Sequence, residues 1–113
     1  MLPKKNRLSG RQFRSFESTL RPFSSRNVNI RYSFGAVPDK LLFAVVISKK
    51  VEKKAVLRNK MRRQVYTIIH SMLPKIKKEA VVAVIYPKKN FFNLSYQVLK
   101  DEIGLALVGT GIM

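Results

Sequence analysis

The chain contains the segment Lys53-Lys54-Ala55-Val56-Leu57-Arg58-Asn59-Lys60-Met61-Arg62-Arg63, which predicts the start of an amphipathic helix. Apolar residues recur through this helix at helical spacing and would form one buried stripe: Leu57, Met61, Val65, Ile68, Ile69 and Met72. The polar positions of the opposite side and flank are Arg58, Asn59, Lys60, Arg62 and Arg63. Such a helix can pack on a core and still present guanidinium groups, which bind phosphate oxygens through paired hydrogen bonds.

The charge balance supports an acidic partner. The chain has 23 Lys and Arg residues against 6 Asp and Glu, for a formal net charge of +17. Self-repulsion at this density favours binding to RNA, DNA or an anionic membrane. Because 46% of the residues are hydrophobic, a disordered basic tail is excluded, and residues 1–113 are expected to form one domain.

The features that this sequence lacks predict the cellular compartment of the protein. The chain has no Cys, so a disulfide framework and a thiolate metal site are excluded. The basic start leads into the polar segment 8–12, which lacks the apolar region of a secretory signal. The longest apolar runs, 41–47 and 80–86, fall far short of the roughly 20 residues of a spanning helix. We therefore expect a cytoplasmic protein that does not bind membranes.

Both ends of the chain are expected to be mobile. Residues 1–7 form a basic arm with Lys4, Lys5 and Arg7. At the other end, residues 109–113 begin with a Gly-Thr-Gly sequence that is expected to end the ordered structure.

A first helix is predicted close to the N-terminus. Ser9 can act as its N-cap, and Gln12, three residues later, would complete a capping box. Leu8 before the cap could pack on Phe13. The helix should span residues 10–19, before Pro22.

Three strands and a last helix complete the pattern. Residues 28–34 alternate between apolar side chains and the polar Asn29, Arg31 and Ser33, as in a half-buried strand. Residues 41–47 and 80–86 are continuous apolar runs, typical of buried strands. Ser95 should cap a final helix. The resulting order α-β-β-α-β-α predicts an α+β sandwich with helices on a small sheet.

Four short motifs follow one another along the chain. They are Lys5-Asn6-Arg7-Leu8 before a helix bearing Phe13, Val46-Ile47-Ser48-Lys49-Lys50, the segment Ala55 to Arg63, and Leu94-Ser95-Tyr96-Gln97. In content and order these motifs resemble the protein component of bacterial ribonuclease P. Three positions depart from that family. Lys60 and Tyr66 stand where Arg is usual, and Glu17 replaces a second Phe, with Phe16 as the nearest aromatic residue.

The resemblance implies a more complete fold than the periodicity alone. Such proteins have a small four-stranded sheet with three helices, in the order α-β-β-β-α-β-α. A left-handed β-α-β crossover holds the signature helix. A fourth strand should therefore lie around residues 23–26.

The resemblance also implies a function. The holoenzyme removes 5′ leaders from precursor tRNA, and its RNA subunit holds most of the catalytic Mg²⁺. One protein monomer would bind one such RNA through the signature helix and its approach, and would contact the leader in a cleft between the first helix and the sheet. The residues implied for the RNA subunit are Lys49, Lys50, Lys53, Arg58, Asn59, Lys60, Arg62 and Arg63. Those implied for the leader are Phe13, Phe16, Asn29 and Arg31.

Other interpretations remain open for these residues. The basic helix face could be merely solvated, the polar strand face could be ordinary exposure, and Phe13 and Phe16 could be core residues. A structural RNA-binding protein, such as a ribosomal protein, would share the charge and size. A membrane-active basic protein is a third class.

No catalytic residue is expected in this chain. His70 is the single histidine, and its place near the end of the signature helix favours a structural role. The six acidic residues are scattered, so neither a paired-carboxylate metal site nor a nucleophile triad is visible. The sequence thus predicts that a partner carries the chemistry.

Overall fold

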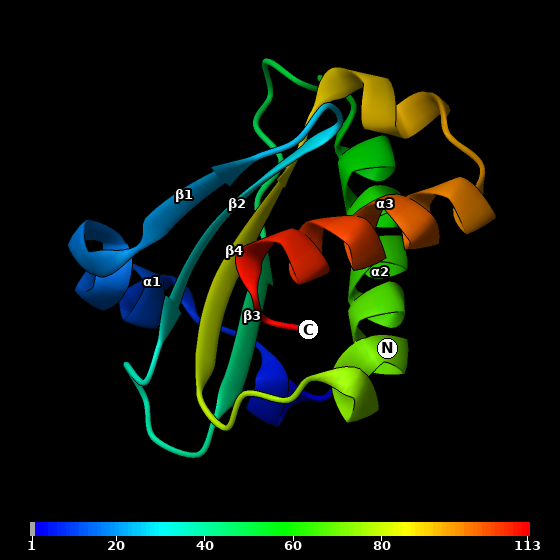
Figure 1. Cartoon of the computed structure of the whole chain (residues 1–113). Helices are drawn as coiled ribbons and strands as arrows, with labels where there is room; N and C mark the ends of the chain where they lie inside the picture. The colour runs from blue at the N-terminus through cyan, green and yellow to red at the C-terminus, as the bar shows by residue number, and fades with distance from the viewer. Residues whose placement is uncertain (1) are drawn as a thin grey trace.

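A four-stranded sheet forms the centre of the fold in this computed structural model, which describes residues 2–113 (Figure 1). Its strands are β1 (Arg21–Ser24), β2 (Val28–Phe34), β3 (Leu41–Val45) and β4 (Val81–Pro87), in the spatial order β1-β2-β4-β3. The β1–β2 and β2–β4 pairs are antiparallel, whereas β3 and β4 are parallel. Strand β1 confirms the predicted fourth strand, although it spans Arg21–Ser24 and therefore begins two residues before the predicted segment 23–26.

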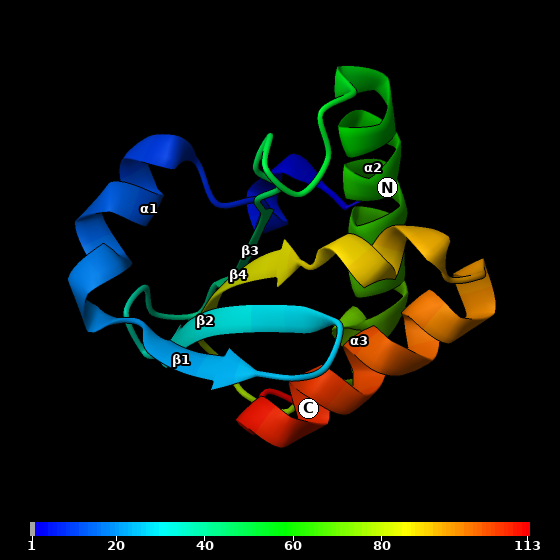
Figure 2. The ribbon, with the colours of Figure 1, turned by 90° about the horizontal axis from the view of Figure 1, so that it is seen from above.

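Helices cover both faces of the sheet. They are α1 (Gly10–Phe16), α2 (Ala55–Met72) and α3 (Tyr96–Thr110). Four short 3₁₀ turns accompany them: η1 (Lys4–Asn6), η2 (Glu17–Thr19), η3 (Leu73–Lys75) and η4 (Lys89–Asn93). Seen from above, α1 lies on one side of the sheet, and α2 and α3 lie on the other (Figure 2). The predicted order α-β-β-β-α-β-α is confirmed.

The first helix begins as its sequence predicts. Ser9 is the N-cap, and its hydroxyl accepts from the Gln12 N–H while the Gln12 side chain accepts from the Ser9 N–H. Helix α1 ends at Phe16, and η2 continues the turn to Thr19. Leu8 is buried in the same apolar cluster on which Phe13 packs, as a hydrophobic staple requires.

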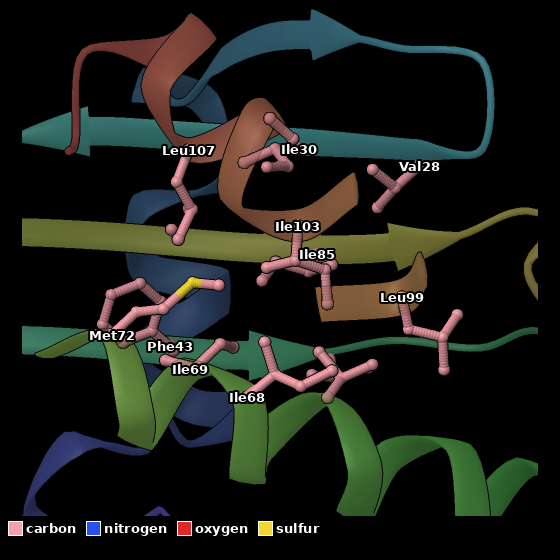
Figure 3. Close-up of a cluster of buried hydrophobic side chains, with 14 of the residues drawn as sticks. Val28, Ile30, Phe43, Ile68, Ile69, Met72, Ile85, Leu99, Ile103 and Leu107 are labelled. Atoms are coloured by element: carbon pink, nitrogen blue, oxygen red, sulfur yellow. The ribbon is translucent and has the colours of Figure 1, made fainter. Parts of the chain in front are cut away.

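Two apolar clusters explain why β4 reads as a continuous hydrophobic run. Val82 and Val84 face α1 in a small cluster, while Val81, Ala83 and Ile85 face α2 and α3 in the main core. A strand covered on both faces has no polar side. Figure 3 shows side chains of β2, β4, α2 and α3 meeting in the main core. Those labelled there are Val28, Ile30, Phe43, Ile68, Ile69, Met72, Ile85, Leu99, Ile103 and Leu107.

The connection from β3 through α2 to β4 has the uncommon hand. Viewed from α2 with both strands pointing upward, β4 lies to the left of β3, so the crossover is left-handed (Figures 1 and 2). About 98% of such connections are right-handed. The expected left-handed crossover is thus present, and it sets α2 beside the β3 edge of the sheet (Figure 2).

The C-terminal segment is packed, which differs from the expected mobile tail at residues 109–113. Gly109 and Thr110 belong to α3, and a Cβ at Gly109 would lie 2.6 Å from the Phe23 ring. Gly111 then adopts a left-handed conformation with a φ of 85°. This reversal turns Ile112 back into the core, where its side chain is fully buried.

The basic arm is also packed, because apolar and polar groups fix it along β3. Leu2 is buried in the main core. The Asn6 side chain donates to the Leu41 carbonyl at 2.9 Å, and the Leu8 N–H donates to the Phe43 carbonyl at 2.7 Å. The expected mobility of residues 1–7 therefore does not match the described residues 2–7, and Met1 lies outside them.

Replacing Ile112 by Ala should lower the free energy of unfolding by about 2 kcal/mol, because it leaves a cavity in the main core. Denaturant unfolding measures the change. Leu105→Ala is the matched control, since Leu105 lies on α3 but is 71% exposed. Equal, small effects of the two substitutions would show that the C-terminus is not packed in solution.

Candidate nucleic-acid interface

The apolar stripe predicted on α2 is buried along most of its length. Met61, Val65, Ile68, Ile69 and Met72 are all core residues. Leu57 is the exception, since 38% of its surface is exposed in the first turn. The Tyr66 ring packs against the main core, and its hydroxyl accepts from the Val45 N–H at 3.3 Å. Tyr66 therefore has a structural role at a position where the resemblance implies Arg.

Arg58 is partly committed to the backbone. Its Nη1 donates to the carbonyls of Glu52 and Lys53, both at 2.8 Å. These carbonyls belong to the loop that enters α2, so Arg58 braces this loop. The guanidinium is half-buried there rather than fully free on an outer flank.

Arg62 is positioned by a neighbouring polar residue. Its Nη1 donates to Asn59 Oδ1 at 2.7 Å, one helical turn earlier. Since Asn59 is exposed, the pair lies at the surface of α2. Asn59 thus orients the Arg62 fork.

The loop before α2 adds three lysines to the same region. A turn forms where the Val51 and Glu52 N–H groups donate to the Ser48 carbonyl, each at 3.1 Å. Lys49, Lys50 and Lys53 are exposed on this turn and its exit. We use the term signature surface for Lys49, Lys50, Lys53, Asn59, Lys60, Arg62 and Arg63. Arg58 lies beneath it as a brace.

A groove of about 290 Å³ lies on the polar face of the sheet, the face that α1 partly covers. Side chains of three neighbouring strands meet there, because the register pairs Pro22 with Arg31, and Asn29 with both Ser24 and Tyr86. The Ser24 hydroxyl donates to Asn29 Oδ1 at 2.8 Å. The groove therefore combines a cation, an amide and an aromatic ring.

Arg31 and Tyr86 lie next to each other in this groove. The Arg31 guanidinium carbon lies 5.8 Å from the centre of the Tyr86 ring, within the range of a cation–π contact. Burial raises the pKa of the Tyr86 phenol above its ordinary value, the Arg31 charge opposes this rise, and the Glu17 charge adds to it. The hydroxyl stays protonated at neutral pH and can donate a hydrogen bond.

The two phenylalanines expected in the cleft lie beside this groove rather than in its lining. Phe13 and Phe16 are half-buried and pack on the small cluster of Leu8, Leu42, Val82 and Val84. Tyr86 packs on the same cluster and also lines the groove. It is the aromatic residue that sequence reasoning missed, and only the strand register could have revealed it.

The basic arm lines a second hollow, of about 450 Å³, between η1 and the start of β3. Lys4, Lys5 and Arg7 lie there, as does Lys40 from the preceding turn. Lys40 was missed because nothing local in the sequence indicates that η1 lies along β3. Together these side chains place four cations around one depression.

Two of the acidic side chains accept hydrogen bonds from neighbouring amide side chains. Glu102 accepts from the Asn27 side chain at 3.2 Å, and Asp101 accepts from Gln97 at 3.1 Å. Within residues 2–113, no three His, Cys, Asp or Glu side chains lie close enough together to hold a metal ion. His70 is exposed on α2.

As far as the structure describes the chain, its helices lack the combined length and apolar character that crossing a membrane requires.

Comparison with known proteins gives one consistent family. A family model described as Ribonuclease P matches residues 2–109. The ribonuclease P protein component of Rippkaea orientalis is 32% identical over 117 residues, covering 99% of this chain and 91% of that protein. The one from Microcystis aeruginosa is 35% identical over 79 residues, or 66% of each chain. A match to the Rickettsia bellii protein, 29% identical, spans 60% of this chain and 57% of the relative.

Solved structures show the same fold at low identity. A Staphylococcus aureus RNase P protein, a mutant with defective mRNA degradation activity, has a TM-score of 0.85 at 16% identity, covering 97% of this chain and 92% of that one. The RNase P protein from Thermotoga maritima has a TM-score of 0.74 at 19% identity, covering 88% and 94%.

Proposed function

Because this chain belongs to the ribonuclease P protein family, we propose that it is the protein subunit of that ribonucleoprotein. It binds the catalytic RNA subunit and the 5′ leader of precursor tRNA in the cytoplasm, and it assists endonucleolytic removal of the leader. One observation carries this proposal: the family's signature lies on an exposed basic helix face, in which Asn59 holds the Arg62 fork.

The RNA subunit binds at the signature surface. Arg62 and Arg63 supply guanidinium groups, and Lys60 with the lysines of the preceding turn supplies point charges around them. Phosphate contacts by such groups release counterions, so binding weakens as salt rises. The buried stripe of α2 makes this surface rigid, because Met61 and Val65 anchor the helix on the core.

The leader binds in the groove across β1, β2 and β4. Single-stranded RNA is bound by cationic grooves in which bases stack on aromatic side chains. Arg31 and Tyr86 supply this combination, and Asn29 adds an amide. Phe13 and Phe16 support Tyr86 from the adjoining cluster, and their partly exposed rings border the path of the strand.

We assign the catalytic Mg²⁺ to the RNA subunit. The acidic side chains of residues 2–113 do not fit a two-ion site, since no group of three potential ligands converges. The protein instead offsets charge repulsion between the RNA subunit and its substrate, for which a net charge of +17 suits it.

Reconstitution of one protein with one bacterial ribonuclease P RNA tests the assignment. Leader cleavage at low Mg²⁺ should increase when the protein is added. A protein that binds RNA in general but leaves leader cleavage unchanged would instead be a structural RNA-binding protein, the competing class.

Replacing Arg31 by Ala should weaken holoenzyme binding to precursor tRNA by about ten-fold, because one cation leaves the groove. Binding of mature tRNA, which has no leader, should remain unchanged. Arg26→Ala is the matched control, since Arg26 is an exposed cation in the turn between β1 and β2 and does not line the groove. Equal losses for precursor and mature tRNA would place the leader elsewhere.

A further inference from the structure

Leu57 is not explained by the core. It occupies a position of the apolar stripe on α2, yet 38% of its surface is exposed. It lines a pocket of about 180 Å³ between α2 and the segment that follows β4. Figure 1 shows η4, the first part of this segment, next to the end at which α2 begins.

The walls of this pocket are fixed by the fold. On the α2 side they are Leu57, Lys60, Met61 and Gln64, which share one helix face. Phe92 and Leu94 form the other side, and the fully buried Phe91 anchors them. The Phe91 N–H donates to the Lys88 carbonyl at 3.0 Å, and the Leu94 N–H donates to the Phe91 carbonyl at 3.2 Å. The opposing wall is therefore a hydrogen-bonded turn.

The chemistry of the lining suits one planar, polar-edged group. Leu57 and Phe92 offer a small apolar surface for one face of a ring, and most of the remaining lining is polar. Gln64 offers an amide that can donate and accept at the same time, and Lys60 stands beside it with a positive charge. The volume is sufficient for one base and insufficient for a base pair.

The position of the pocket identifies the occupant. Lys60 belongs both to the pocket and to the signature surface, so the two are continuous. Arg63 lies one turn after Lys60, so a strand of RNA whose phosphates contact Lys60 and Arg63 would pass the pocket entrance. Proteins recognise RNA sequence mainly by taking unpaired bases out of the stack and binding their edges.

We propose that the pocket between α2 and η4 binds one unpaired nucleobase of the RNA partner, with Gln64 bonded to the base edge and Lys60 near its phosphate. This inference rests on the proposed function. It adds a base-specific contact to a surface that otherwise binds phosphates.

Filling the pocket tests the proposal. Leu57→Trp would occupy it from an exposed position, and Leu105→Trp is the control, because Leu105 lies on α3, is 71% exposed and does not line the pocket. Gln64→Met removes the amide at similar length. Each protein is bound to a bacterial ribonuclease P RNA over a range of salt concentrations, and the Watson–Crick edges of the RNA bases are probed chemically. Thermal unfolding verifies that every variant is folded.

Leu57→Trp and Gln64→Met should each lower affinity by about ten-fold at every salt concentration. The slope of affinity against salt should stay unchanged, because every phosphate remains bound. One base that the wild type protects should become reactive, and Leu105→Trp should retain both affinity and protection.

Three results would overturn the pocket alone: wild-type affinity in the filled variant, equal losses in both tryptophan variants, or no change in base protection. Failure of the wild type to bind this RNA would overturn the proposed function, and the pocket proposal with it.

Discussion

Replacing both Arg62 and Arg63 by Ala should weaken binding to a bacterial ribonuclease P RNA by about 100-fold or more at physiological salt. Each guanidinium can make charge-assisted hydrogen bonds to phosphate, worth roughly 1.5–3 kcal/mol apiece. The fold should survive, because Arg63 is exposed and, within residues 2–113, the Arg62 side chain donates only to Asn59. Arg58 is a poorer choice, since its removal would also release the carbonyls of Glu52 and Lys53.

The salt dependence separates phosphate binding from a general reduction of charge. The slope of log affinity against log salt should flatten by about one unit for each phosphate that is no longer neutralised, and so by about two units in the double variant. Lys75→Ala with Lys77→Ala is the matched control, because it removes the same charge beyond the opposite end of α2. Binding of the Arg62, Arg63 variant as tight as that of the wild type would refute the signature surface.

The long helices and strands of this fold can be predicted from the sequence, because regular packing gives them a periodic pattern of apolar residues. Helix α2 has its apolar residues at helical spacing, and β2 alternates over its whole length. Strand β1 gives no such signal, since it has four residues, one of them Pro22, and only Phe23 packs against the core. Its existence followed only from the family resemblance.

The packing of the two chain ends could not be predicted, for a different reason. Leu2 and Ile112 each have one apolar neighbour, a methionine, and otherwise lie next to basic or glycine-rich sequence, so local composition predicts mobility. Both are buried by contacts with residues far away in the sequence. No window of the sequence contains that information.

Exposed members of the candidate interface were predictable, whereas side chains gathered by strand register were not. The helical cations of the signature surface, Lys60, Arg62 and Arg63, follow from the helical spacing that buries Met61 and Val65. Tyr86 reaches the groove because β4 pairs with β2 so that it lies opposite Asn29. Lys40 reaches the hollow of the basic arm through a packing of η1 on β3 that no local pattern predicts.

RNA-free protein should not cleave precursor tRNA at any Mg²⁺ concentration. Proteins that cleave phosphodiesters with metal ions usually hold two of them about 4 Å apart with converging carboxylates. Of the acidic residues in the described chain, Asp101 and Glu102 are adjacent on α3, and each accepts a hydrogen bond from a different amide side chain. Cleavage assays over a wide Mg²⁺ range, with purified protein and labelled precursor, measure this directly.

Addition of a bacterial ribonuclease P RNA should reverse that result. The holoenzyme should cleave at low Mg²⁺, where the RNA alone is slow, because 17 net positive charges offset the repulsion between two polyanions. His70→Ala should leave the chemical step unchanged, since His70 is exposed near the end of α2. A folded His70→Ala protein with a much slower single-turnover cleavage step would refute this view of His70. Site-specific removal of the leader by RNA-free protein would place the chemistry in this chain instead of in the RNA.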